Sequence, residues 1–215
     1  MTFELFASAD ATASLPLDDG AAVLRGFALT DAATLRADID AIVADAPFRH
    51  LVTPGGFRMS VAMTNCGARG WVSDRRGYHY DACDPDSGKR WPPMPASFRT
   101  LARAAAAELG FAGFAPDACL VNRYEPGARL TLHQDRDENG YDAPIVSVSL
   151  GLPATFLWGG LARSDRTRRV PLAHGDVVVW GGASRMRYHG VLPLRPGTHP
   201  LLGEQRINLT FRKAA

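Results

Sequence analysis

A histidine and an aspartate two positions apart, His133 and Asp135, stand at the end of a hairpin pattern in residues 120–135. Two runs of alternating polarity flank a Pro-Gly turn there, which predicts two antiparallel strands. Side chains at positions i and i+2 of a strand point to the same face, so the imidazole and the carboxylate lie side by side. His189, much later in the chain, can complete a set of two histidines and one carboxylate. Such a set is expected to bind non-haem Fe(II) and to be catalytic, with coordination positions left open for oxygen and a substrate.

The C-terminal stretch 206–212 carries a second polar face. Alternation places four polar residues on one side of a predicted strand: Arg206, Asn208, Thr210 and Arg212. The apolar residues Ile207, Leu209 and Phe211 point to the other side. Two guanidiniums on an otherwise apolar strand need anionic partners, because a buried unpaired charge is costly. A small dicarboxylate meets that need, since arginine pairs with carboxylates through two hydrogen bonds. The polar face is therefore its predicted site.

Taken alone, the H-x-D pair is a weak signal, because any strand with mixed polar residues can produce it. Zinc is the competing metal, since it also binds histidine and aspartate. A zinc site leaves the charged C-terminal strand without a role, which favours iron. The other histidines are expected in turns or at the surface: His50, His79, His174 and His199.

Together, H-x-D, a distant histidine and R-x-N-x-T-x-R resemble the AlkB family of iron and 2-oxoglutarate-dependent dioxygenases. The resemblance runs through CLVNRYEPGARLTLHQDRDE, APIVSVSLGLPATF, HGDVVVWGG, YHGVLPL and RINLTFR, which cover most of residues 119–212. It implies oxidative dealkylation in DNA repair, with O2 and 2-oxoglutarate as co-substrates and succinate, carbon dioxide and formaldehyde as products. The implied substrates are N-methylated bases, such as 1-methyladenine and 3-methylcytosine, in single-stranded or flipped-out DNA.

Two alternatives stay open beside DNA repair. The same oxygenase chemistry can act on RNA (tRNA or mRNA), on protein or on a small molecule. A non-enzymatic jelly-roll binding module with a vestigial site is the other alternative, and the intact set of histidine, aspartate and arginine residues opposes it.

The resemblance also implies how 2-oxoglutarate is held. Arg206 is expected to pair with its distal carboxylate, helped by Tyr124 and Asn208. Asn122 shares a face of the first hairpin strand with Tyr124 by the period of two. Arg212 lies six residues from Arg206, roughly 20 Å along a strand, so the two cannot grip one carboxylate. We expect Arg212 at the metal-proximal end; a salt bridge that closes the barrel is the alternative.

Residues 66–95 read as an irregular stretch, in which aromatic side chains stand among arginines, glycines and prolines. Aromatic residues interleaved with cations suit single-stranded nucleic acid, where bases stack and phosphates pair with arginine. A surface loop pinned by a few buried aromatics is the alternative. The resemblance implies a nucleotide-recognition lid here, with Trp71 on one face of the damaged base and the His133 ring on the other. Asp137 would favour the positive charge of such a lesion. Contacts to phosphates, which give affinity without sequence readout, are expected from Tyr78, Tyr80 and Arg163.

The elements that position these residues follow from periodicity. Helices are predicted over about 31–46 and 97–109. A hairpin is predicted over residues 50–65, with one face packed in a core: Phe57, Met59, Val61 and Met63. Met63, nearest the aromatic stretch, is instead expected to touch substrate.

From residue 117 onward, short alternating strands recur with turns between them, which is typical of a jelly roll. We predict an α+β, mainly β fold in a single domain spanning residues 1–215. A double-stranded β-helix core occupies about 116–213, and an N-terminal extension over about 1–115 supplies the covering helices and the lid.

Composition sets outer limits on function. With 46% hydrophobic and 21% charged residues and a net charge of +2, the chain is no polycation that coats nucleic acid. Three widely spaced cysteines without C-x-x-C indicate reduced thiols. The N-terminus has no secretory signal pattern, and no apolar run approaches the roughly 20 residues that span a bilayer. We expect a cytoplasmic monomer without an obligate protein partner.

Overall fold

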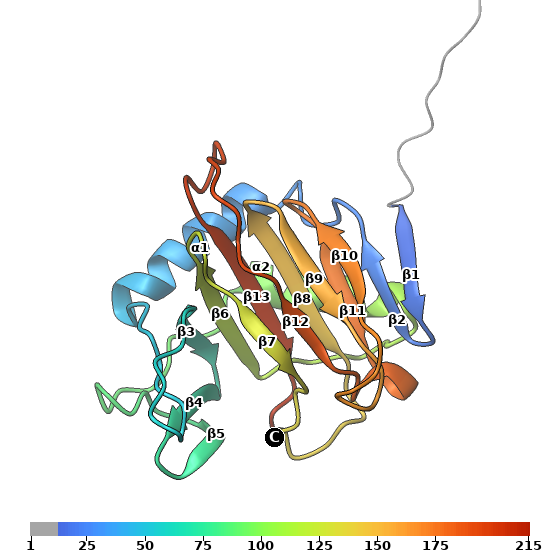
Figure 1. Cartoon of the computed structure of the whole chain (residues 1–215). Coiled ribbons are helices and arrows are strands. Elements are labelled where there is room, and N and C mark those ends of the chain that lie inside the picture. Colours follow the sequence, from blue (N-terminus) through green and yellow to red (C-terminus); the bar gives the residue numbers. More distant parts are fainter. Residues whose placement is uncertain (1–12) are drawn as a thin grey trace, which may run out of the picture.

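The computed structural model of the chain describes residues 13–215. Its strands form a seven-stranded sheet, a four-stranded sheet and a separate two-stranded sheet. The four-stranded sheet lies in front of the seven-stranded sheet, and the helices lie behind it (Figure 1). The predicted mainly β, α+β fold with a jelly-roll core is confirmed.

The two large sheets consist of antiparallel neighbours throughout. The seven-stranded sheet has the order β1 (Ser14–Asp18), β2 (Ala21–Leu24), β11 (Val177–Trp180), β8 (Ile145–Gly151), β13 (Arg206–Arg212), β6 (Ala118–Tyr124) and β3 (Ala62–Gly67). The four-stranded sheet has the order β10 (Arg168–Leu172), β9 (Ala154–Trp158), β12 (His189–Val191) and β7 (Leu130–His133). Strands β1, β2 and β3 precede residue 116, yet they hydrogen-bond into the large sheet.

Two α-helices cover the outer face of the seven-stranded sheet, α1 (Ala32–Asp45) and α2 (Ala96–Glu108). A short 3-10 helix, η1 (Gly182–Ser184), lies between β11 and β12. The buried face of α2 meets the apolar face of β13, where the Phe98 and Phe211 rings meet edge to face with centroids 5.7 Å apart. Burial of one such side chain contributes about 1.5–3 kcal/mol. The predicted helices are therefore present, and they hold the back of the sheet that carries β13.

A second core fills the space between the two large sheets, with Trp180, Phe156 and Trp158 among its members. The polar side chains of β13 point into this space, since Ile207, Leu209 and Phe211 belong to the core on the helix side. Alternate side chains of β13 therefore point into an apolar core on one side of the sheet and into a polar cavity on the other.

The stretch before α2 differs from expectation in two ways. Residues 66–95 are not irregular throughout, because they contain the hairpin of β4 (Gly70–Asp74) and β5 (Gly77–Asp81). The hairpin predicted over residues 50–65 is mostly absent: only isolated bridges occur before β3 begins at residue 62. Phe57 is 77% exposed, so its predicted core position is wrong. It lies beyond the last bridge, at the turn tip, and cannot reach the core that Val61 and Met63 fill.

Within the described residues, no helix is long and apolar enough to cross a membrane. The three cysteines are free, and Cys66 and Cys119 are buried as register partners of β3 and β6.

Candidate active site

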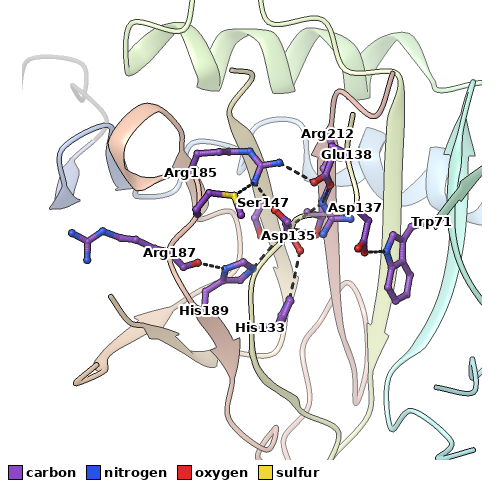
Figure 2. A network of polar contacts seen from close by, with 12 residues as sticks. Trp71, His133, Asp135, Asp137, Glu138, Ser147, Arg185, Arg187, His189 and Arg212 are labelled. Atoms are coloured by element: carbon purple, nitrogen blue, oxygen red, sulfur yellow. Dashed lines mark hydrogen bonds and ion pairs between the residues drawn. The ribbon is translucent and has the colours of Figure 1, made fainter. Parts of the chain in front are cut away.

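The predicted metal ligands meet between the two large sheets. His133 ends β7, His189 begins β12, and the two are register partners whose ring centroids lie 4.4 Å apart. Asp135 follows β7 by two residues, and one ligand atom from each side chain lies within 4.8 Å of the others. The Asp135 oxygens Oδ1 and Oδ2 lie 3.7 Å from His133 Nε2 and 3.8 Å from His189 Nε2, respectively. Figure 2 shows the three side chains converging. Three donors around one point fit a metal ion.

The backbone fixes the orientation of both imidazole rings. His133 Nδ1 donates to the carbonyl of Thr131 at 2.8 Å, and His189 Nδ1 donates to the carbonyl of Arg187 at 3.0 Å. A carbonyl only accepts, so the proton of each neutral ring lies on Nδ1 and the Nε2 lone pair remains for a metal.

Burial and neighbouring charges also set the protonation states of Asp135 and His189. Burial alone would raise the pKa of Asp135, but Arg212 and the two histidines outweigh it and hold the pKa well below its usual range. Burial, together with the neighbouring His133, lowers the pKa of His189 to about 4. At neutral pH the carboxylate is therefore ionised and His189 is neutral, which are the states that bind a metal.

The two arginines of β13 occupy opposite ends of the same cavity, whose volume is about 810 Å³. Arg206 is 1% exposed; its Nε and Nη2 donate to Ser149 Oγ at 3.0 and 2.8 Å, and its guanidinium lies over the Tyr124 ring. Its buried Nη1 finds no acceptor among residues 13–215. Arg212 instead donates to Asp135 at the metal end, as predicted.

The pKa shifts of Arg212 and Arg206 differ in direction, because their surroundings differ in charge. Burial acts to lower the pKa of Arg212, but Asp135, Tyr80 and Glu138 outweigh it, so that the pKa is raised. Burial lowers the pKa of Arg206; Tyr124 opposes this only in part, and no carboxylate of the described residues does so. Arg206 is thus a buried cation in need of an anion, and a carboxylate of 2-oxoglutarate fits that need.

The remaining residues predicted for 2-oxoglutarate surround Arg206 across the sheet. Asn122 and Tyr124 on β6 are the register partners of Asn208 and Arg206 on β13. Asn122 Oδ1 is buried without a donor among the described residues. The Thr210 hydroxyl donates to Asn208 Oδ1 at 2.9 Å, so it orients the amide that lines the cavity.

Comparison with known proteins points to the same kind of site. The family model for the 2OG-Fe(II) oxygenase superfamily matches residues 20–212. The chain is 59% identical to the alpha-ketoglutarate-dependent dioxygenase AlkB of Salmonella typhimurium over 200 residues, which cover 93% of each chain. It is 56% identical to the protein of the same name from Escherichia coli over 211 residues, 98% of this chain and 97% of that one. The chain belongs to the AlkB family.

The solved structure of OsALKBH1 supports the same family fold, with a TM-score of 0.83 at 30% identity, covering 94% of this chain and 100% of that chain. This AlkB-family member is an Fe(II)/2-oxoglutarate-dependent dioxygenase, and O2 is its second co-substrate. The predicted family, enzyme class and cofactors are confirmed, and zinc is set aside.

The residues predicted to meet the substrate, except Tyr80, line the same cavity in this AlkB-family fold. Its lining includes Met63, Trp71, Tyr78, His133, Asp137 and Arg163. Trp71 Nε1 donates to Asp137 Oδ2 at 2.8 Å, and the indole stacks on Tyr78 with centroids 5.2 Å apart. One face of Trp71 is thus covered, and a base can stack only on the other. Arg163 donates to the Leu132 carbonyl at 2.7 Å, beside β7.

Tyr80 lies elsewhere than predicted. Its hydroxyl donates to Glu138 at 2.8 Å and accepts from Arg212 at 3.3 Å. The hydroxyl is therefore engaged inside the protein, and this conformation does not offer it to a phosphate.

Several polar residues at the site were missed from the sequence. Ser147 and Ser149 alternate with valines on β8 and bond Asn208 and Arg206, so their period of two was a usable signal. Glu138 and Arg185 gave no such signal, because each stands in an irregular segment.

Proposed function

We propose that this dioxygenase repairs DNA by oxidative dealkylation of N-methylated bases such as 1-methyladenine and 3-methylcytosine. One observation carries the proposal: Trp71 and Asp137, hydrogen-bonded to each other, line the same cavity as the metal ligand His133. A flat aromatic surface and a carboxylate beside a redox metal suit a planar, cationic base. Such a base is also the least costly to extrude from a duplex.

We assign the metal and co-substrate to the residues described above. His133, Asp135 and His189 would hold Fe(II). The residues for 2-oxoglutarate would be Asn122, Tyr124, Arg206, Asn208, Thr210 and, at the metal end, Arg212. When bound, iron lets O2 oxidise 2-oxoglutarate to succinate and carbon dioxide and the N-methyl group to formaldehyde, with one oxygen atom in each oxidised product.

The residues of the chain would bind 2-oxoglutarate and the base, orient them and exclude water from the site. Arg206 would take the distal carboxylate of 2-oxoglutarate through its free Nη1. The buried walls of the cavity keep the reacting groups dry and at fixed separation. Trp71 and the His133 ring would hold the base between them, Asp137 would balance its positive charge, and Met63 would line its pocket.

We further propose single-stranded DNA as the preferred form, because an unpaired base needs no extrusion. Tyr78 and Arg163 stand at the cavity rim, where a phosphate backbone would pass. The chain would act as one domain, since β1, β2 and β3 complete the sheet that carries the 2-oxoglutarate residues. We propose a monomer as well.

The direct test is mass spectrometry of a single-stranded DNA oligonucleotide with one 3-methylcytosine, incubated with protein, Fe(II), 2-oxoglutarate and ascorbate. The wild type should remove the methyl group and release formaldehyde, and His133→Ala should not. Activity that survives a chelator would overturn the mechanism. Succinate without loss of the methyl group would overturn the substrate, and the same lesion in RNA would then be the next substrate to compare.

Trp71→Ala separates base binding from co-substrate turnover. Without the indole, demethylation should fall by about 5–150-fold, because stacking contributes about 1–3 kcal/mol per base. Slow 2-oxoglutarate turnover without substrate should persist, since the Trp71 indole bonds Asp137 and stacks on Tyr78, neither of which is assigned to iron or 2-oxoglutarate. Equal loss of both activities would count against a role in base binding.

A further inference from the structure

One of the three metal ligands, Asp135, depends on irregular backbone for its position. Asp135 lies in the segment 134–144, which has no helix or strand, and the turn over residues 185–188 leads into His189. His133 and His189, by contrast, are paired with each other where β7 and β12 meet. Beyond this pair no sheet ladder joins the Asp135 segment to the turn before His189, and side chains link the two instead.

Arg185 spans these two segments. It follows η1 directly, and its Nη1 donates to the backbone carbonyl of Asp135 at 2.7 Å. Its Nε donates to the carbonyl of Ala143 at 3.1 Å, and its Nη2 donates to Glu138 Oε2 at 3.0 Å. One guanidinium thus ties the turn before His189 to three points of the Asp135 segment. Gln134 adds a bond in the reverse direction, from Nε2 to the Met186 carbonyl at 2.5 Å.

Glu138 is the point where the charges around Asp135 converge. Its side chain is 2% exposed and that of Arg185 is 3% exposed. Its Oε1 accepts from the Tyr80 hydroxyl at 2.8 Å and lies 3.4 Å from Arg212 Nε. Arg212 in turn holds the Asp135 carboxylate. Asp135 is therefore fixed at its carbonyl by Arg185 and at its side chain by Arg212, with Glu138 between the two guanidiniums (Figure 2).

We propose that Arg185 and Glu138 are positioning residues that hold the Asp135 segment and the His189 turn in register for metal binding. Buried ion pairs are weak sources of stability, because desolvation offsets most of their attraction. Partners that orient metal ligands are worth about 10–100-fold in metal affinity. This inference rests on the proposed iron site, and it does not depend on the proposed nucleic-acid substrate.

The test compares metal binding in the wild type, Arg185→Lys and Glu138→Gln. Lysine keeps the charge but cannot reach three acceptors from one rigid fork. Glutamine keeps the shape of glutamate but removes the anion. Co(II), added to chelator-treated protein, is the probe; its affinity and visible spectrum report ligand number and geometry. Each variant should bind Co(II) about 10–100-fold more weakly than the wild type, with an altered spectrum.

A second readout separates positioning from folding. A metal that binds only the folded state raises the melting temperature according to its affinity. A merely structural role for the pair would lower the melting temperature equally with and without Co(II). A positioning role predicts that the rise caused by Co(II) itself becomes smaller in both variants.

Arg36→Lys is the matched control. Arg36 also donates to a carboxylate, that of Asp40, and to a distant backbone carbonyl, that of Leu201, but on α1. Its substitution should leave Co(II) affinity unchanged. The double variant Arg185→Met/Glu138→Leu removes both charges together, so it keeps the test valid if a single variant unfolds.

Wild-type Co(II) affinity and spectrum in the folded variants would overturn the proposal. A wild type that binds Co(II) but demethylates no oligonucleotide would overturn only the proposed substrate.

Discussion

Arg212 donates two hydrogen bonds to a single oxygen of Asp135, from Nε at 3.0 Å and from Nη2 at 2.7 Å, both to Oδ2. The other oxygen, Oδ1, is the one nearer to His133 Nε2, at 3.7 Å. Arg212 on β13 therefore fixes the orientation of the Asp135 carboxylate and stabilises its ionised form without a bound metal. Oδ1 stays free of Arg212 and faces His133, while Oδ2 faces His189 and also accepts from Arg212.

Replacement of Arg212 by methionine should disrupt this arrangement. Removing one partner of a buried ion pair leaves an uncompensated charge and costs about 3–5 kcal/mol. The pKa of Asp135, now below its usual range, should rise, because burial would act without its main opponent. Urea unfolding of the metal-free protein measures the loss of stability, and Co(II) titration at several pH values measures metal affinity.

The sign of the acid dependence follows from the lowered pKa. Stability from ionised Asp135 is present above the ordinary carboxyl pKa of about 3.9 and is lost as pH falls below it. In Arg212→Met the folded-state pKa of Asp135 should lie closer to or above the unfolded value, so this loss of stability on acidification should become smaller or disappear. An unchanged acid profile would mean that Arg212 does not control the ionisation of Asp135.

His189 should make the metal-free protein sensitive to mild acid. The folded protein holds the pKa of His189 at about 4, whereas an unfolded chain takes up the proton near 6.5. Below about pH 6.5 the unfolded state therefore binds more protons, and stability falls until pH reaches about 4. The full loss is about 3 kcal/mol, at 1.36 kcal/mol per pH unit. Urea unfolding between neutral pH and about pH 4 should show this slope, and His189→Gln should lack it.

Arg206→Lys should weaken 2-oxoglutarate binding. A hydrogen bond to a charged group contributes about 1.5–3 kcal/mol, so the KM for 2-oxoglutarate should rise about 10–100-fold. Ser149→Ala removes only the hydroxyl that holds Arg206 Nε and Nη2, so its KM should rise less. Succinate production at varied 2-oxoglutarate measures both. The reverse order of the two effects would place the co-substrate elsewhere in the cavity.

Gly190→Ala should separate β12 from β7. A Cβ at this position would lie 2.8 Å from the Leu130 carbonyl oxygen and 3.2 Å from Leu132 N, both backbone atoms that cannot rotate away. The strand must shift at the residue next to His189, which should cost about 1–3 kcal/mol and weaken Co(II) binding at least about tenfold. Gly140→Ala is the control, because its added Cβ meets no atom within 4 Å. Equal Co(II) affinity in the two variants would contradict this account.

The sequence alone was informative wherever a local period dictates which way side chains point. On β13 the period of two predicted which residues face the cavity and which face the helices, and the helix-side core bears this out for Leu209 and Phe211. The spacing of His133 and Asp135 predicted adjacent ligands, although Asp135 lies just beyond the strand that was expected to carry it. The same reasoning failed for Phe57, because alternation says nothing about whether a strand is paired at all.

What only the tertiary structure decided are contacts between segments far apart in the sequence. The register of β7 and β12 brings His189 against His133, and no local pattern encodes that register. The inward turn of the Tyr80 hydroxyl and the Arg185–Glu138 pair likewise join irregular segments across the fold. Local sequence sets backbone preference and side-chain direction over a few residues, whereas these contacts depend on how whole sheets close over a shared core. The sequence therefore determined which residues could do the chemistry, and the closure of the two sheets decided how they are held.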